Sequence, residues 1–296
     1  MSAVSAAGAA GGVVEGLLTM ASMVLVCLLV AGYGRGVQEL WRRGAVRLVP
    51  PWRVAAFGAG LLTVLAAEHG PMHALAEGSF AGHMTQHMMF LLGSGPLLAA
   101  GAAGLPLSLA TPLALRRRLA RWRVGPGLRW TRRPVAGALV AGAGQAVVLW
   151  FWHLPGAYVA AVDHPVLHAA EHLCFAALSW SFWSPMLGAA RHRPPVPVAV
   201  LLLAGTMLPA SALGAVLTFA PQPVYPLRVF GADPLADQQL AGLLMWAPMD
   251  VVVILVSLGL FLRWLIRLDQ TRPDGRRPVP AGRAGAPLDA EREGAL

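Results

Sequence analysis

The chain has 296 residues, of which 56% are apolar and only 12% are charged, and its mean hydropathy is +0.60. This composition excludes an ordinary soluble domain, in which roughly a quarter of the residues are charged. All 23 basic residues are arginine, and with 14 acidic residues they give a formal net charge of +9. The two cysteines, Cys27 and Cys174, form no CxxC pair, so the sequence predicts neither a disulfide framework nor a thiolate zinc site.

Seven apolar runs have about the length, near 20 residues, that a helix needs to cross the hydrocarbon core of a bilayer. In chain order they are 12–33, 54–70, 80–101, 135–153, 166–187, 197–219 and 239–262. We therefore predict an all-α, polytopic integral membrane protein with seven transmembrane helices in one domain, residues 12–265. A short extracytoplasmic segment, 1–11, precedes it. The tail 266–296 is rich in Pro, Gly, Arg and Ala, a composition typical of disorder.

The arginines predict the orientation of the spans, because cytoplasmic loops carry an excess of positive charge. Every arginine except Arg228 follows the first, third, fifth or seventh span. We therefore expect the N-terminus outside, the C-terminus in the cytoplasm, and a location in the bacterial plasma membrane. The excess of arginine is then explained by insertion into the lipid bilayer, and it does not require a nucleic-acid partner. The segment 116–133 either sets topology only or lies as an amphipathic stretch on anionic lipid.

The histidines lie almost entirely on the other side. Only His192 falls in a predicted cytoplasmic loop, while eight histidines fall in outer loops or in the outer halves of spans two to five. Polar side chains at membrane depth are costly and usually face the bundle interior or a functional site. The bias predicts a chemical task at the outer face. The eight are His69, His73, His83, His87, His153, His164, His168 and His172.

The spacing of five histidines predicts a metal site. His83 and His87, and likewise His168 and His172, are four residues apart, a spacing that places both rings on one helix face about 5 to 6 Å apart at Cβ. His153 ends span four at a similar depth. One such pair alone is as readily explained by hydrogen bonds between helices. Two pairs with His153 favour metal ligation, while His69 and His73 either form an outer capture site or are solvated loop residues.

Several other residues are candidates for supporting roles around these histidines. Met84 and Met88 offer thioethers to Cu(I), although packing is the commoner role. Glu171 and Asp237 are placed to orient the imidazoles, and Asp237 is equally a helix cap. Asp250, near the middle of span seven, is either a structural polar clamp or part of a proton or metal relay.

The donor set decides which group the site would take. Imidazole with optional thioether, without thiolate and with few carboxylates, favours copper, with zinc next. Haem is the main competitor, and would need one histidine from each of two helices, such as His87 facing His172. We do not expect the protein to be an enzyme, because the chain has no Gly-rich phosphate loop, GxSxG or HExxH motif. The HxxEH letters at 168–172 resemble an inverted zinc-protease motif only by composition.

These motifs together resemble the seven-span CtaG family of cytochrome c oxidase assembly factors, over roughly residues 12 to 265. The resemblance rests on motifs in matching order. They are His83-Met84 with His87-Met88, Trp152-His153-Leu154-Pro155 with Tyr158, His168 with Glu171-His172 and Phe175, Phe182-Trp183-Ser184-Pro185, and Asp237-Gln238-Gln239 with Ala241-Gly242-Leu243 and Met245-Trp246.

The resemblance implies a non-enzymatic plasma-membrane factor needed to mature a haem-copper oxidase, with an oxidase subunit as its partner. Combined with the outer histidines, it leads to the hypothesis of a copper-binding factor that hands its ion to that subunit. Two alternatives stay open, namely a haem-binding electron-transfer protein and a copper transporter or resistance permease. A homo-oligomer also stays open.

Overall fold

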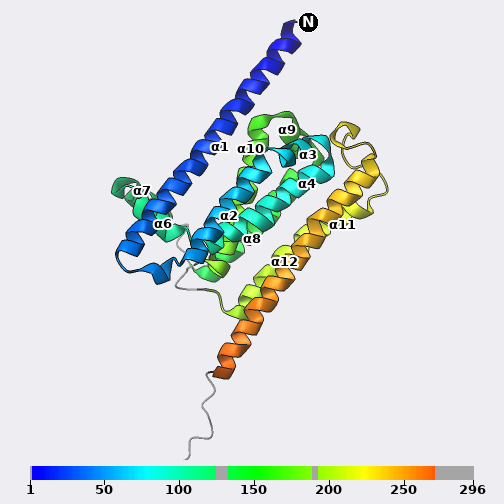
Figure 1. Cartoon of the computed structure of the whole chain (residues 1–296). Coiled ribbons are helices and arrows are strands. Elements are labelled where there is room, and N and C mark those ends of the chain that lie inside the picture. Colours follow the sequence, from blue (N-terminus) through cyan, green and yellow to red (C-terminus); the bar gives the residue numbers. More distant parts are fainter. Residues whose placement is uncertain (1, 125–132, 189–192, 271–296) are drawn as a thin grey trace, which may run out of the picture.

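The computed structural model describes residues 2–124, 133–188 and 193–270. In these ranges the chain is all-helical, without strands, and the long helices run side by side in one bundle (Figure 1). The predicted all-α class is therefore confirmed. Residues 271–296 of the predicted tail lie outside the described residues, whereas 266–270 continue the last helix.

Six long helices overlap six of the seven apolar runs from which spans were predicted. All except the first begin with or near a proline, which is favoured in the first turn because the N–H that proline lacks would have no partner there. The first helix begins at Ser2 and continues past its predicted span. They are α1 (Ser2–Arg42), α2 (Pro51–Glu68), α8 (Pro134–Trp152), α10 (Pro165–Leu187), α11 (Val196–Phe219) and α12 (Pro234–Gln270).

The remaining predicted span, 80–101, is interrupted. It consists of α4 (Phe80–Met88), the π-helix η2 (Met89–Ser94) and α5 (Gly95–Ala100). The Ser179 hydroxyl donates a hydrogen bond of 2.7 Å to the carbonyl oxygen of Leu91 within η2, which supports the widened turn from outside the helix. After Ala100 the chain bends by 68° into α6 (Gly104–Ala110).

Length and composition qualify α1 from Gly11 onward, α8, α11 and α12 as membrane spans, and the bent α4-to-α6 unit is a fifth candidate. The protein is thus a helical membrane protein. Of the predicted spans, α2 and α10 lie outside this set. Both carry polar residues that lower their mean hydropathy, Arg53 and Glu68 at the ends of α2 and a His-Glu-His group in α10.

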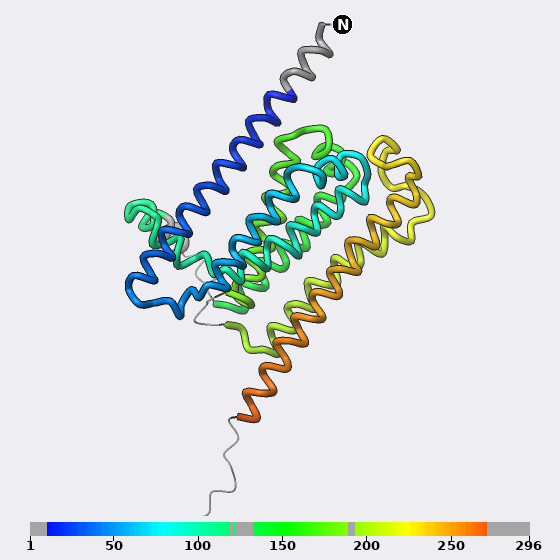
Figure 2. Tube along the Cα trace, viewed as in Figure 1, coloured from blue at the N-terminus to red at the C-terminus, as the bar shows by residue number. Residues whose placement is uncertain are grey.

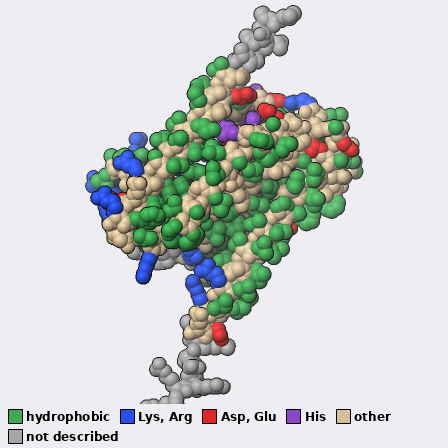
Figure 3. Space-filling view, in the orientation of Figure 1, with side chains coloured by type: hydrophobic (Ala, Val, Ile, Leu, Met, Phe, Trp, Pro, Cys, Tyr) green, Lys and Arg blue, Asp and Glu red, His purple; other side chains and the backbone are tan. Residues whose placement is uncertain are grey.

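Shorter helices close the two ends of the bundle. At one end lie α3 (Pro71–Gly78), α9 (Pro155–Asp163) and the 3-10 turn η4 (Leu227–Val229). At the other lie η1 (Val46–Leu48), α6 and α7 (Leu113–Val124), whose Arg116, Arg117 and Arg118 are exposed. Figure 3 shows basic side chains gathered at this second end, and histidine with acidic side chains at the first.

Small residues set the distances between helices. A Cβ at Gly214 or Gly242 would collide with the facing helix of the α11–α12 pair, and one at Gly36 of α1 would collide with Pro106 of α6. Close backbone approach through small residues is the usual packing mode in membranes. The N-terminal part of α1 extends past the rest of the bundle (Figure 2).

Candidate metal centre

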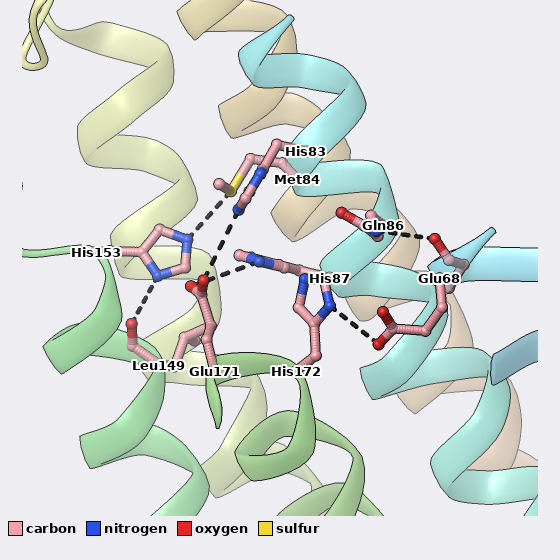
Figure 4. A network of polar contacts seen from close by, with 10 residues as sticks. Glu68, His83, Met84, Gln86, His87, Leu149, His153, Glu171 and His172 are labelled. Atoms are coloured by element: carbon pink, nitrogen blue, oxygen red, sulfur yellow. Dashed lines mark hydrogen bonds and ion pairs between the residues drawn. The ribbon is translucent and has the colours of Figure 1, made fainter. Parts of the chain in front are cut away.

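The two predicted histidine pairs face each other between α4 and α10, and Figure 4 labels three of the four histidines, His83, His87 and His172. His83 and His87 lie on α4, with ring centroids 4.4 Å apart, and His168 and His172 lie on α10, 4.2 Å apart. Across the interface, the rings of His83 and His168 stack at 5.1 Å. The i,i+4 spacing predicted each pair, and the fold brings the two pairs together.

Glu171 lies at the centre of this cluster. Its Oε1 is 3.5 Å from Nε2 of His87 and its Oε2 is 3.9 Å from Nε2 of His83, and its side chain is 0% exposed. The sequence assigned Glu171 a supporting role. The structure instead makes it a member of two groups that could each hold an ion, one with His83 and His87 and one with His168 and His172, in which the ligand atoms lie within 4.8 Å of one another.

The facing atoms of the cluster have no hydrogen-bond partner among the described residues. This applies to both carboxylate oxygens of Glu171 and to imidazole nitrogens of four histidines, namely Nε2 of His83, both ring nitrogens of His87, Nε2 of His168 and Nε2 of His172. Buried polar atoms are normally hydrogen-bonded, and an unpaired one costs about 1 to 3 kcal/mol. Bound metal cations would give such atoms the partners that they lack.

Glu68 orients one of the imidazoles. Nδ1 of His172 donates to the Glu68 carboxylate over 3.1 Å, so Nε2 carries the lone pair and is the ligand atom. Carboxylate–histidine pairs of this kind fix the tautomer in metal sites. Sequence reasoning missed Glu68. The available signal was its position at the outer end of span two, next to His69.

His153 approaches the cluster from α8 but belongs to neither group of three. Its Nδ1 donates to the carbonyl oxygen of Leu149 over 2.6 Å, and its Nε2 faces the sulfur of Met84 at 3.1 Å. Because a carbonyl oxygen only accepts, the neutral ring has its lone pair on Nε2. The lone pair of the His153 ring and the thioether of Met84 therefore point at each other. The ring centroid of His153 is 5.8 Å from that of His87.

Asp237 supports the site through the backbone of α4. Its carboxylate accepts hydrogen bonds from the amides of Phe80 and Ala81 at 2.8 and 3.0 Å, and from that of Gly231 at 2.8 Å. The N-terminus of α4 is thus capped by Asp237 of α12 together with Ser79, whose side chain accepts from the amide of Gly82. The cap of α12 itself is Asp233, whose side chain accepts from the amide of Ala236.

Two of the predicted supporting residues do not reach the cluster. Asp250 accepts a 2.8 Å hydrogen bond from Ser211 and lies 13 residues beyond Asp237 on the same helix, which is about 20 Å along the axis. It fastens α12 to α11 instead. Met88 lies in the main hydrophobic core.

Aromatic side chains cover the site. Phe80, Tyr158, Tyr225 and Phe230 pack together with ring centroids about 5 Å apart, and the Tyr158 ring is 5.2 Å from that of His83. Burial raises the pKa of Tyr158 and of Tyr225 well above the usual value, so both phenols are neutral. The Tyr225 hydroxyl donates to the carbonyl oxygen of His153.

A cavity of about 960 Å³ connects to the cluster beside α1. Its lining includes three imidazoles of the cluster, His83, His168 and His172, together with Glu68. His69 and His73 also line it, the second 3.4 Å from Glu77. His164, in contrast, is exposed at the start of α10.

The composition of the site suits a borderline or soft transition metal, since it offers imidazoles, one thioether and few carboxylates. The Phe90 ring packs on His172 and the Phe175 ring packs on His87, with ring centroids 4.8 and 4.7 Å apart. These side chains occupy the space beside the imidazoles, which favours an ion over the flat macrocycle of haem.

Comparison with known proteins places the chain in a family. No curated protein and no solved structure matches it. The family model described as cytochrome c oxidase caa3 assembly factor (Caa3_CtaG) matches residues 31–267, which include every residue of the histidine cluster. The chain therefore belongs to the Caa3_CtaG family of cytochrome c oxidase assembly factors.

Proposed function

We propose that this protein binds copper through His83, His87, His168 and His172 with Glu171, and hands it to a subunit of a haem-copper oxidase during assembly. The observation that carries this proposal is the set of unpaired imidazole nitrogens around one unpaired, fully buried carboxylate. In this proposal the role of the protein is to bind and transfer an ion, without catalysing a reaction. Family membership supports the oxidase as the partner.

Exchange of the ion needs a route, and the cavity beside α1 supplies one. It reaches three imidazoles of the cluster and the Glu68 carboxylate, so an incoming ion meets ligands before it is fully enclosed. Imidazole ligands exchange more readily than a closed set of four thiolates, which suits a protein that must release its cargo. His153 and Met84 lie beside the cluster as a soft pair of donors for Cu(I).

The proposal includes a seven-span topology in the bacterial plasma membrane, with the histidine end outside. The helices α2 and α10 have 18 and 23 residues, which lie within the range of about 17 to 25 residues of membrane-spanning helices. The polar residues that lower the hydropathy of α10 face the bundle, since Glu171 and His172 are buried. The exposed arginines of α7 then mark the cytoplasmic end.

Anaerobic loading with Cu(I) tests the function. We expect purified protein to retain copper through gel filtration, and the combined His83→Ala, His87→Ala, His168→Ala and His172→Ala variant to lose it. His164→Ala is the matched control, because His164 is exposed and outside the cluster, and it should bind as the native protein does. The proposal fails if the four-histidine variant binds as much copper as the native chain.

Two further readouts separate the alternatives. A reduced-minus-oxidised Soret band in the pure protein would replace the copper proposal with a haem protein. Copper uptake into sealed vesicles that is lost with Asp250→Asn would instead favour a permease. We expect neither, and we expect cells carrying the four-histidine variant to assemble oxidase with less copper than cells carrying His164→Ala.

A further inference from the structure

The candidate metal centre is divided into two halves. One group of ligand atoms comes from His83, His87 and Glu171, and the other from His168, Glu171 and His172; within each group the atoms lie within 4.8 Å of one another, and in the described residues the five side chains form two such groups rather than one. Ligands of one ion, at about 2.0 Å from it, must all lie within about 4 Å of one another. One ion cannot use both histidine pairs without rearrangement.

We infer that the site holds two copper ions, one per histidine pair, with Glu171 bridging them. This inference rests on the proposed function. A carboxylate has two oxygens and can bind a different ion with each, as in two-metal sites whose ions are about 3.5 to 4 Å apart. In Glu171 both oxygens are unpaired. Oε1 and Oε2 approach His87 and His83 of the α4 pair, and a Glu171 oxygen also lies within 4.8 Å of ligand atoms of His168 and His172.

Hydrogen bonding supports two ions. A single ion on the α4 pair would leave Nε2 of His168 and Nε2 of His172 buried without a partner, and a single ion on the α10 pair would leave those of His83 and His87. Unpaired buried polar atoms are costly. Two ions give one nitrogen of each of the four imidazoles a partner.

Charge points to the same number. Two carboxylates serve the cluster, Glu171 at its centre and Glu68 behind His172. Two Cu(I) ions balance these two negative charges; the Glu171 side chain is fully buried, where an isolated charge is expensive, while the Glu68 side chain is 26% exposed. The inference therefore specifies two monovalent ions.

The two halves differ in access. His83, His87 and Glu171 are all buried, and of these three only His83 lines the cavity. On the α10 side His168 is partly buried, and His168, His172 and Glu68 all line the cavity. The ion on the α10 pair is thus the one that exchanges more readily with the cavity.

Copper stoichiometry of the full-length protein in detergent, loaded anaerobically with excess Cu(I) and desalted, tests the inference. We expect two ions per native chain, one in His83→Ala/His87→Ala, one in His168→Ala/His172→Ala, none in the four-histidine variant and two in His164→Ala. X-ray absorption of the native protein should show copper–copper scattering at about 3.5 to 4 Å, which both double variants lose. This second measurement needs no variant to fold.

The outcomes distinguish this inference from the proposed function. One ion per native chain, without copper–copper scattering, overturns the bridged pair and leaves copper binding intact. A native chain that binds no more copper than the four-histidine variant overturns both. Glu171→Gln should reduce the content to one ion and remove the copper–copper scattering, because a carboxamide offers one good ligand oxygen; two ions with unchanged scattering in this variant would overturn the bridging role of Glu171.

Discussion

Two carboxylates lie deep among the apolar helices, and they have opposite surroundings. Asp250 on α12 accepts a hydrogen bond from Ser211 on α11, so it fastens two helices together. Glu171 on α10 has no hydrogen-bond partner for either oxygen among the described residues and faces imidazoles instead. The comparison teaches that depth alone does not identify a functional acid. A buried carboxylate that is hydrogen-bonded within the protein is structural. A buried carboxylate that has no hydrogen-bond partner and faces other potential ligand atoms is a candidate for binding a cation.

Neutralising each acid in turn should have the largest and most different effects. Glu171→Gln should weaken Cu(I) binding by at least about tenfold, the lower limit seen for loss of groups around a metal. Asp250→Asn should leave copper affinity unchanged and lower the free energy of unfolding by about 1 kcal/mol, the worth of one hydrogen bond. Chelator competition and thermal unfolding measure the two effects. Equal losses of affinity in both variants would contradict the distinction.

A smaller effect should follow when the acid that caps the metal-binding helix is removed. Asp237→Ala deprives the amides of Phe80 and Ala81 of their acceptor, which should destabilise the fold by about 1 to 2 kcal/mol and weaken copper binding several-fold because His83 and His87 lose their fixed positions. Asp233→Ala is the matched control, since it uncaps α12 only. We expect the control to lose stability but not affinity; the reverse pattern would show that Asp237 does not position the site.

The smallest expected effect concerns the type of metal. Met84→Leu removes the thioether that faces His153 and should lower Cu(I) affinity a few-fold while leaving Zn(II) affinity unchanged, because zinc prefers nitrogen and oxygen over thioether. Met88→Leu, one turn further along α4 and buried in the core, is the control. Parallel titrations with both metals measure the ratio. The same ratio in both variants would assign Met84 to packing alone.

Sequence patterns predicted the histidine pairs, because an i,i+4 spacing fixes two side chains on one helix face whatever surrounds them. They also predicted the all-helical membrane fold. They did not reveal that Glu171 lies between the pairs, since its position depends on how α10 faces α4. Glu68 was missed for the same reason, because its partner His172 is 104 residues away.

Three further features depended on tertiary contacts. Asp237 is at the right place to cap its own helix, yet the fold uses it to cap α4, 157 residues earlier in the chain. Met84 and Met88 have the same spacing as the histidines, but among the described residues only the sulfur of Met84 is found against an imidazole. The π-helix η2 interrupts the regular periodicity of span three, and its Leu91 carbonyl is satisfied by Ser179 from another helix.

The position of the ion in the protein tests the central claim most directly. Crystals of the copper-loaded protein, measured at the copper absorption edge, should show anomalous density between α4 and α10, within bonding distance of Glu171 and of imidazoles from both helices. Density located only elsewhere, such as on His69 and His73 in the cavity or on the exposed His164, would contradict it.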